Sequence, residues 1–110
     1  VYYYENFMVD QLLDCIPDKQ VLEDFVRLSI GSLREYDLEH GTNLVKTLEI
    51  YFECNANVSI ASKKLFLHRN SLIYRMDRIK EILNSDLKNP TELLALQVGL
   101  RVQKILEARA

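Results

Sequence analysis

The residues of this chain that could do chemistry are basic and polar, and its most basic stretch lies at residues 58–80. Residues 58–80 contain six lysines and arginines and one acidic residue, whereas residues 1–57 contain four basic and eleven acidic residues. The formal net charge is −2, which by itself argues against a nucleic-acid ligand. A local positive field is nevertheless what attracts a polyanion, because the overall charge governs mainly solubility. The charge distribution therefore favours nucleic-acid binding, although a merely solvated basic helix would give the same count.

The basic segment, residues 57–83, has the pattern of two helices joined by a tight turn. The first helix is expected over about 58–66, with Asn57 or Ser59 as its cap. Ala61 is informative, because a helix-turn-helix needs a small side chain where its first helix leans on the second. The expected inward residues of this helix are Ile60, Ala61 and Leu65.

The second helix is expected over about 69–83, after a turn at 66–68 in which Leu67 fills the space between the helices. Four apolar residues recur at helical spacing and should be buried, namely Leu72, Met76, Ile79 and Leu83. The opposite side carries groups that can hydrogen-bond base edges or phosphates, as a recognition helix does in the major groove. The candidate DNA-contacting residues are Ser59, Lys63, His68, Arg69, Asn70, Ser71, Tyr74, Arg75 and Arg78.

Several of these side chains have an ordinary structural role as an alternative. Tyr74 could pack its ring against a neighbouring helix, and His68 suits a turn or a helix cap better than a base contact. Arg75 and Arg78 could pair with carboxylates of the same helix or of the scaffold. The joint placement of the polar groups, rather than any one of them, therefore carries the prediction of DNA binding.

The remainder of the chain has the pattern of helices that hold this segment in place. Three glycines and two prolines in 110 residues leave little for the turns of an all-β fold. Gly31 and Ser32 should weaken the second helix, and a loop is expected at 37–41. The further helices are expected at about 6–15, 19–30, 42–54 and from 90 onward. We therefore predict an all-α fold, a compact bundle of about six helices.

The last helix has the strongest start signal. Asn89 stands at the cap, Pro90 at the first helical position and Glu92 at the third. Gly99 lies inside this helix, where glycine costs about 1 kcal/mol relative to alanine; a close helix crossing or chance would account for it. We expect a single domain over residues 1–110, with a helical scaffold at 1–40 and the helix-turn-helix region at 42–110.

The sequence contains no arrangement typical of an enzyme or a metal site. It has no glycine-rich phosphate loop, and neither His40 nor His68 has a nucleophile or a metal-spaced cysteine beside it. The acidic pairs Glu23/Asp24 and Glu35/Asp37 are expected on solvated faces. We therefore expect a protein without enzymatic activity and without a cofactor.

The two cysteines, Cys15 and Cys54, stand apart from each other. A disulfide between them is an alternative, but two buried, reduced thiols in a cytoplasmic protein are the favoured interpretation. No apolar run approaches the roughly 18–20 residues of a membrane span, so no membrane contact is expected. Because the chain begins with Val1 rather than methionine, we expect it to be a piece of a longer protein.

Two strings of the sequence are specific enough to suggest a family. Residues 44–51 read Leu-x-x-Thr-Leu-x-x-Tyr, and residues 68–79 read HRNSLIYRMDRI. Together with Ala61 and Leu65 they resemble the C-terminal helix-turn-helix domain of PucR/CdaR-type bacterial transcriptional regulators. Ser71 replaces the usual threonine, and Asn84 stands where glycine usually follows the recognition helix. A looser similarity is to the DNA-binding end of the nucleoid protein Fis, which implies a Fis-like helix-turn-helix.

The resemblance implies sequence-specific binding of double-stranded DNA by the output domain of a regulator, commonly an activator of catabolic genes. It implies an effector-sensing domain that precedes these 110 residues, and we expect a homo-oligomer, a dimer in the full-length protein. The alternative is a helical dimerisation or protein-interaction module with no direct DNA contact. Residues 1–57 suit that role, since a helix-turn-helix needs only the later part of the chain.

Overall fold

Helices dominate residues 4–109, which are the residues that the computed structural model describes, with side chains from residue 7 onward. Within this range the chain forms six helices and no strand, which confirms the predicted all-α fold. The helices are α1 (Tyr4–Asp14), α2 (Lys19–His40), α3 (Leu44–Glu53), α4 (Val58–Lys64), α5 (Arg69–Leu83) and α6 (Pro90–Arg109).

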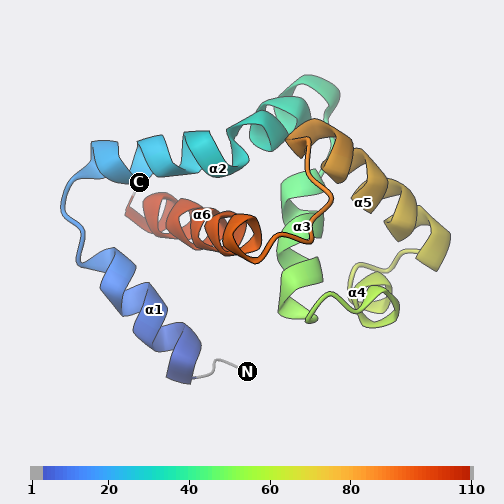
Figure 1. The fold of residues 1–110 in the computed structure, drawn as a ribbon, viewed down its shortest axis with the longest axis horizontal. Coiled ribbons are helices and arrows are strands. Elements are labelled where there is room, and N and C mark those ends of the chain that lie inside the picture. Colours follow the sequence, from blue (N-terminus) through green and yellow to red (C-terminus); the bar gives the residue numbers. More distant parts are fainter. Residues whose placement is uncertain (1–3, 110) are drawn as a thin grey trace.

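The long helices α2 and α6 form the largest helix–helix contact of the fold (Figure 1). Helices α3 and α5 also pack against α2. α4 packs on α3 and α5, whereas α1 contacts α6. Because α6 touches α1, α2 and α3, its apolar surface is broader than a helix with one neighbour would need. Figure 1 shows that α4 and α5 lie at the opposite end of the molecule from α2's first turns.

The core is built almost entirely from aliphatic side chains of five helices. Leu22, Ile30, Leu33, Leu48, Leu72 and Ile79 are among the largest fully buried side chains of the described residues. Between residues 22 and 33, successive turns of α2 contribute its four core residues, Leu22, Val26, Ile30 and Leu33, as expected for one buried stripe of a helix. Phe25, which precedes Val26, is not part of this buried stripe and is 37% exposed.

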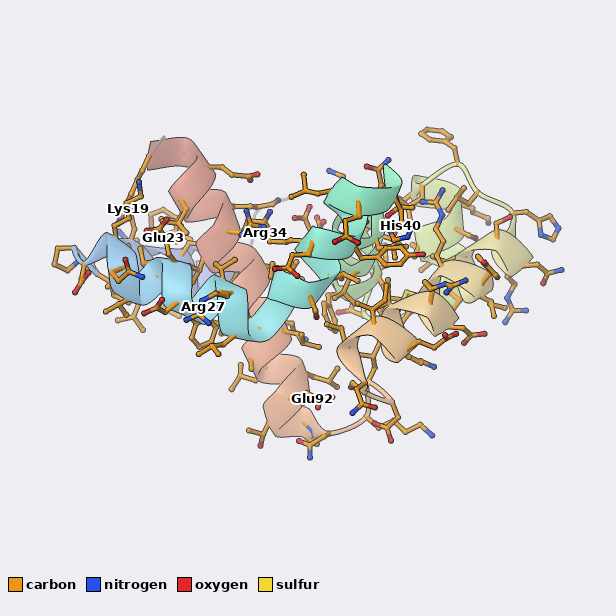
Figure 2. All side chains as sticks on the ribbon, turned by 90° about the horizontal axis from the view of Figure 1, so that it is seen from above. Lys19, Glu23, Arg27, Arg34, His40 and Glu92 are labelled. Carbon is orange, nitrogen blue, oxygen red and sulfur yellow. The ribbon has the colours of Figure 1, made fainter. Side chains whose placement is uncertain are left out.

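Helix α2 is longer than the sequence predicts, because the loop expected at 37–41 begins only at Gly41. Gly31 does not end the helix. Figure 2 shows α2 changing direction between Arg27 and Arg34. Glycine–serine pairs and serines that bond back to the helix backbone are common causes of such bends, and the Ser29 hydroxyl donates to the Phe25 carbonyl at 2.7 Å. Gly31 and Ser32 therefore lie at a bend of α2 and not at its end.

Asp37 joins the scaffold to the rest of the fold, and the expectation that it lies on a solvated face is wrong. Its backbone carbonyl accepts from the Gly41 and Thr42 amides at the end of α2. Its half-buried carboxylate accepts from the Leu44 amide at 2.8 Å, from the Val45 amide at 2.9 Å and from the Thr42 hydroxyl. One residue thus ends α2 and caps α3. Its side chain replaces Asn43, which occupies the cap position without a side-chain hydrogen bond.

Gly99 lies where α6 crosses α2. A Cβ atom at this position would lie 2.1 Å from the Ser29 Oγ and 2.9 Å from the Ser29 Cβ, distances that no real side chain tolerates. Gly99 therefore permits a close helix crossing. The sequence left open whether the glycine reflects such a crossing or chance, and the structure supports the crossing. Asn89 also caps α6 as predicted, accepting from the amides of Thr91 and Glu92.

The two cysteines differ in environment. Both thiols are free, with Cys54 buried and Cys15 exposed. The disulfide alternative is therefore not formed in this structure, and the expectation that both thiols are buried is wrong for Cys15. The reason is local, because Cys15 follows the last residue of α1, a helix that contacts only α6.

Candidate nucleic-acid interface

Helix α4 is short and is held at its start by Asn57. The Asn57 side chain accepts from the Ile60 amide at 3.0 Å, which makes Asn57 rather than Ser59 the cap. Ala61 is fully buried, as predicted, and allows α4 to lie close to its neighbours. Ser62 is also buried, and its hydroxyl donates to the Ser59 carbonyl at 2.9 Å. Ile60 was predicted to face inward but is 53% exposed.

The buried face of α4 is therefore rotated by about one residue from the predicted one. With seven residues the helix makes only two turns, so Ala61 and Ser62 fill its contact with α3 and α5, and Val58 and Leu65 lie at the edge. Ser59 and Lys63, which the sequence nominated for DNA contact, are exposed on the other side. Lys64 is exposed beside Lys63, a cation that was not in the predicted set.

The turn between the helices places His68 at the start of α5. The His68 Nδ1 accepts from the Asn70 amide at 3.1 Å, so the imidazole caps α5, as its alternative role suggested. The ring is exposed nonetheless. Leu67 is half-buried, whereas Phe66 points to solvent.

Helix α5 is buried on one side and polar on the other. Leu72, Met76 and Ile79 are buried, and Leu83 is half-buried against the same core. The first turn of the opposite side, formed by Arg69, Asn70 and Ser71, is exposed. Asn84 ends the helix in the left-handed conformation with φ of 51°, as expected where glycine is otherwise favoured. The three buried anchors thus fix which face of α5 points outward.

Tyr74 does not pack in the core. Its side chain is 64% exposed, and its hydroxyl accepts a hydrogen bond from the Arg78 Nη2 at 3.0 Å. The Arg78 guanidinium also lies 5.8 Å from the centre of the Tyr74 ring, within range of a cation–π contact. Donating this hydrogen bond to Tyr74 raises the pKa of Arg78 above its ordinary value. The two side chains therefore form an exposed unit on the outer face of α5.

Arg75 points toward the scaffold instead. Its Nη1 donates to the Thr47 Oγ1 at 3.3 Å, and Thr47, which is fully buried, donates in turn to the Asn43 carbonyl at 2.8 Å. Arg75 is half-buried. A guanidinium has five N–H donors, so the contact with Thr47 leaves others for a ligand. Arg75 therefore connects the outer face of α5 to α3, a role that the sequence did not indicate.

Among residues 7–109, no carboxylate forms an ion pair with the exposed cations of this face. The ion pairs found among residues 7–109 involve α1, α2, α3 and α6 but neither α4 nor α5. Lys63, Lys64 and Arg69 thus pair with no carboxylate of the described residues. From residue 54 to residue 76 the sequence has no acidic residue at all. The end of α4 and the first turn of α5 therefore both carry exposed cations, with no acidic residue between them in the sequence.

The geometry of α4, the turn and α5 agrees with comparisons to known proteins. Residues 44–102 match the family model described as the PucR C-terminal helix-turn-helix domain. The chain belongs to this family. PucR-type helix-turn-helix domains are DNA-binding modules of transcriptional regulators and not enzymes, so membership supplies the function class that the sequence predicted. No solved structure matches the chain significantly.

The chain is similar to parts of longer regulators. It is 33% identical over 100 residues to the DNA-binding transcriptional activator AdeR of Bacillus subtilis, covering 91% of this chain and 24% of that protein. It is 34% identical over 98 residues to the purine catabolism regulatory protein of the same organism, covering 89% and 18%. It is 33% identical over 103 residues to the carbohydrate diacid regulator of Escherichia coli, covering 94% and 26%.

The chain thus spans about a quarter or less of the length of these relatives. Among residues 4–109 no helix has both the length and the apolar composition needed to cross a membrane.

Proposed function

We propose that α5 enters the major groove of double-stranded DNA and reads its sequence, as the recognition helix of a bacterial transcriptional regulator. The observation that carries the proposal is the division of α5 into a buried side and an outer side. Leu72, Met76 and Ile79 fix the helix on the core, and the outer side joins the unpaired cations of α4. A helix oriented in this way presents its N-terminal half to base edges while neighbouring cations hold phosphates.

The outer side chains divide into two groups by position. Those on α5 suit contact with base edges, because Arg pairs with guanine, Asn with adenine, and hydroxyl groups with either partner. Those on α4 and the turn suit phosphates, because they lie beside the helix rather than on its outer face. The proposed base-contacting residues are Arg69, Asn70, Ser71, Tyr74 and Arg78. The proposed phosphate-contacting residues are Ser59, Lys63 and His68, with Arg75 reaching the backbone through its remaining donors.

The regulator that contains this domain is proposed to act in the cytoplasm as an activator of catabolic genes. AdeR and the proline-responsive PutR are named transcriptional activators, and the purine catabolism regulatory protein is named for a catabolic role. An effector-sensing domain is proposed for the part of the protein that lies outside these 110 residues.

The test of α5 as the recognition helix is a charge-matched pair of variants. Lys63→Ala with Arg69→Ala removes two exposed cations of the interface, and Lys19→Ala with Lys88→Ala removes two exposed cations elsewhere. Arg75 is left in place because its substitution would also break the hydrogen bond with Thr47. Duplexes are first selected by the parent chain from a random pool, and affinity is then measured by fluorescence anisotropy over a range of salt concentrations.

We expect the interface variant to bind about thirtyfold more weakly or worse, because two lost charge contacts of about 1 kcal/mol each weaken binding by about 2 kcal/mol. The slope of log K against log salt should become shallower by about 0.9 for each phosphate that the variant no longer neutralises. The control variant should bind like the parent, and both should melt within about 2 °C of it, since exposed substitutions rarely change stability by more than about 0.5 kcal/mol. Equal binding by the two variants would refute the assignment.

We also propose that the domain self-associates through α2. Val21 and Leu28 are 52% and 77% exposed, and with the 37% exposed Phe25 they recur at the spacing of one helix face. This stripe lies on a different side of α2 from its four core residues. An exposed apolar stripe of this kind suits a second copy of the chain.

The measurement is sedimentation equilibrium of the parent and of a Leu28→Glu variant. The parent should show a mass that rises with concentration toward that of a dimer. The variant should remain monomeric, because a buried carboxylate without a partner is costly. A parent that stays monomeric at high concentration would contradict self-association through this domain without affecting the proposal for α5.

A further inference from the structure

Phe66 occupies the turn between α4 and α5 in a way that the packing of the protein does not explain. Its side chain is 95% exposed, the highest value among the exposed large apolar side chains of the described residues. Its φ of 57° is in the left-handed region, which few residues other than glycine adopt without cost. A large aromatic ring is thus held in solvent on a strained backbone position.

The strain comes from the way in which α4 ends. The Leu67 amide donates to the Ser62 carbonyl at 2.9 Å, and the Phe66 amide donates to the Lys63 carbonyl at 3.1 Å. This pair of bonds is the Schellman motif, in which the residue at the Phe66 position is most often glycine. Glycine would relieve the backbone, and a polar residue would suit the solvent. The ring therefore brings no stabilising contact to the folded chain that would offset either cost.

The surroundings of the ring indicate what it meets. Lys63 and Lys64 precede it, and Arg69 follows it after the turn. All three are exposed and unpaired within the described part of the chain. An apolar group with three unpaired cations and no carboxylate within three residues of it in the sequence is complementary to a polyanion that also has apolar surface. The sugar rings of DNA lie between the phosphates and provide such a surface.

We propose that Phe66 packs against the deoxyribose backbone of the duplex, at the edge of the groove that α5 enters. This inference rests on the proposed function of α5. The cations beside Phe66 hold the phosphates on either side, and the ring covers the sugar between them. Because every nucleotide offers the same sugar, the contact adds affinity without choosing a sequence.

The test is Phe66→Gly, measured on the duplex selected by the parent and on an unrelated duplex. Glycine accepts the left-handed conformation, so the variant should melt at or above the temperature of the parent. Its affinity for both duplexes should fall by about five- to twentyfold because less apolar surface is buried. The salt dependence should stay that of the parent, because no charge is removed. Leu12→Ala, which removes a side chain that is 70% exposed on α1, is the matched control and should bind like the parent.

Two further variants keep the result interpretable. Phe66→Asn also tolerates the left-handed conformation and should bind as weakly as Phe66→Gly, whereas Phe66→Tyr retains the ring and should bind like the parent. If Phe66→Gly and Phe66→Asn bind DNA like the parent, the proposed contact with deoxyribose is refuted, and a protein becomes the alternative partner of the ring. If both variants melt well below the parent, the ring has a role in folding and the inference is wrong. Failure of the parent to bind any duplex would instead overturn the proposed function itself.

Discussion

The strongest structural prediction concerns Asp37, because the carboxylate of this α2 residue caps the next helix, α3. The change is Asp37→Ala, which removes the acceptors for the Leu44 and Val45 amides and for the Thr42 hydroxyl. A helix cap contributes about 0.5–2 kcal/mol, and hydrogen bonds to charged groups contribute about 1.5–3 kcal/mol. Since these bonds share one half-buried side chain, they are not additive, and we expect the free energy of unfolding to fall by about 2–3 kcal/mol.

The change is measurable by thermal melting followed by circular dichroism. For a chain of this size each kcal/mol corresponds to about 4 °C, so the melting temperature should fall by about 8–12 °C. Asp37→Asn retains one oxygen acceptor and should lose about half as much. Glu35→Ala, which changes an exposed carboxylate on the same helix, should shift the free energy of unfolding by no more than about 0.5 kcal/mol. The capping role of Asp37 is refuted if Asp37→Ala has the same melting temperature as Glu35→Ala.

The other predictions concern glycines and the cap of α5. Gly99→Ala should destabilise the fold by about 1–3 kcal/mol by overpacking against Ser29. Gly31→Ala should instead stabilise the fold by about 0.5–1 kcal/mol, because the added Cβ would meet the Arg27 side chain at an ordinary 3.5 Å. Urea unfolding compares the two, and the crossing geometry is wrong if both change stability in the same direction. His68→Ala should lose about 1 kcal/mol with the cap of the Asn70 amide. His68→Asp should keep the stability of the parent but bind DNA more weakly, because it puts an anion among the cations; parent-like affinity would count against a DNA contact near this turn.

The fold was largely predictable from local patterns. The burial of Leu72, Met76 and Ile79 follows from helical periodicity alone, and the start of α6 follows from capping residues that act within one turn. The caps at Asn57 and Asn84 are local in the same sense. Signals of this kind depend on residues a few positions apart, so a single sequence contains them completely.

The features that were missed depend on contacts between different helices. Asp37 looks like a solvated carboxylate because the amides that it accepts from belong to the next helix. The inward face of α4 was misplaced at Ile60 because two turns of helix define a face poorly, and packing on α3 and α5 decides it. The hydrogen bond of Arg75 to a threonine 28 positions away was not predicted, whereas its predicted contact with DNA stays a prediction. The DNA contacts of the interface stay predictions in the same way, because they depend on a molecule outside the chain.

The difference between the two cysteines has a practical consequence. Cys15 is exposed after the end of α1, and Cys54 is buried in the core. A thiol-directed spin label or fluorophore will therefore modify one site per chain without any engineered substitution. Two copies bound to one duplex would then carry two labels, and the distance between them would report directly on how the copies are spaced along the DNA.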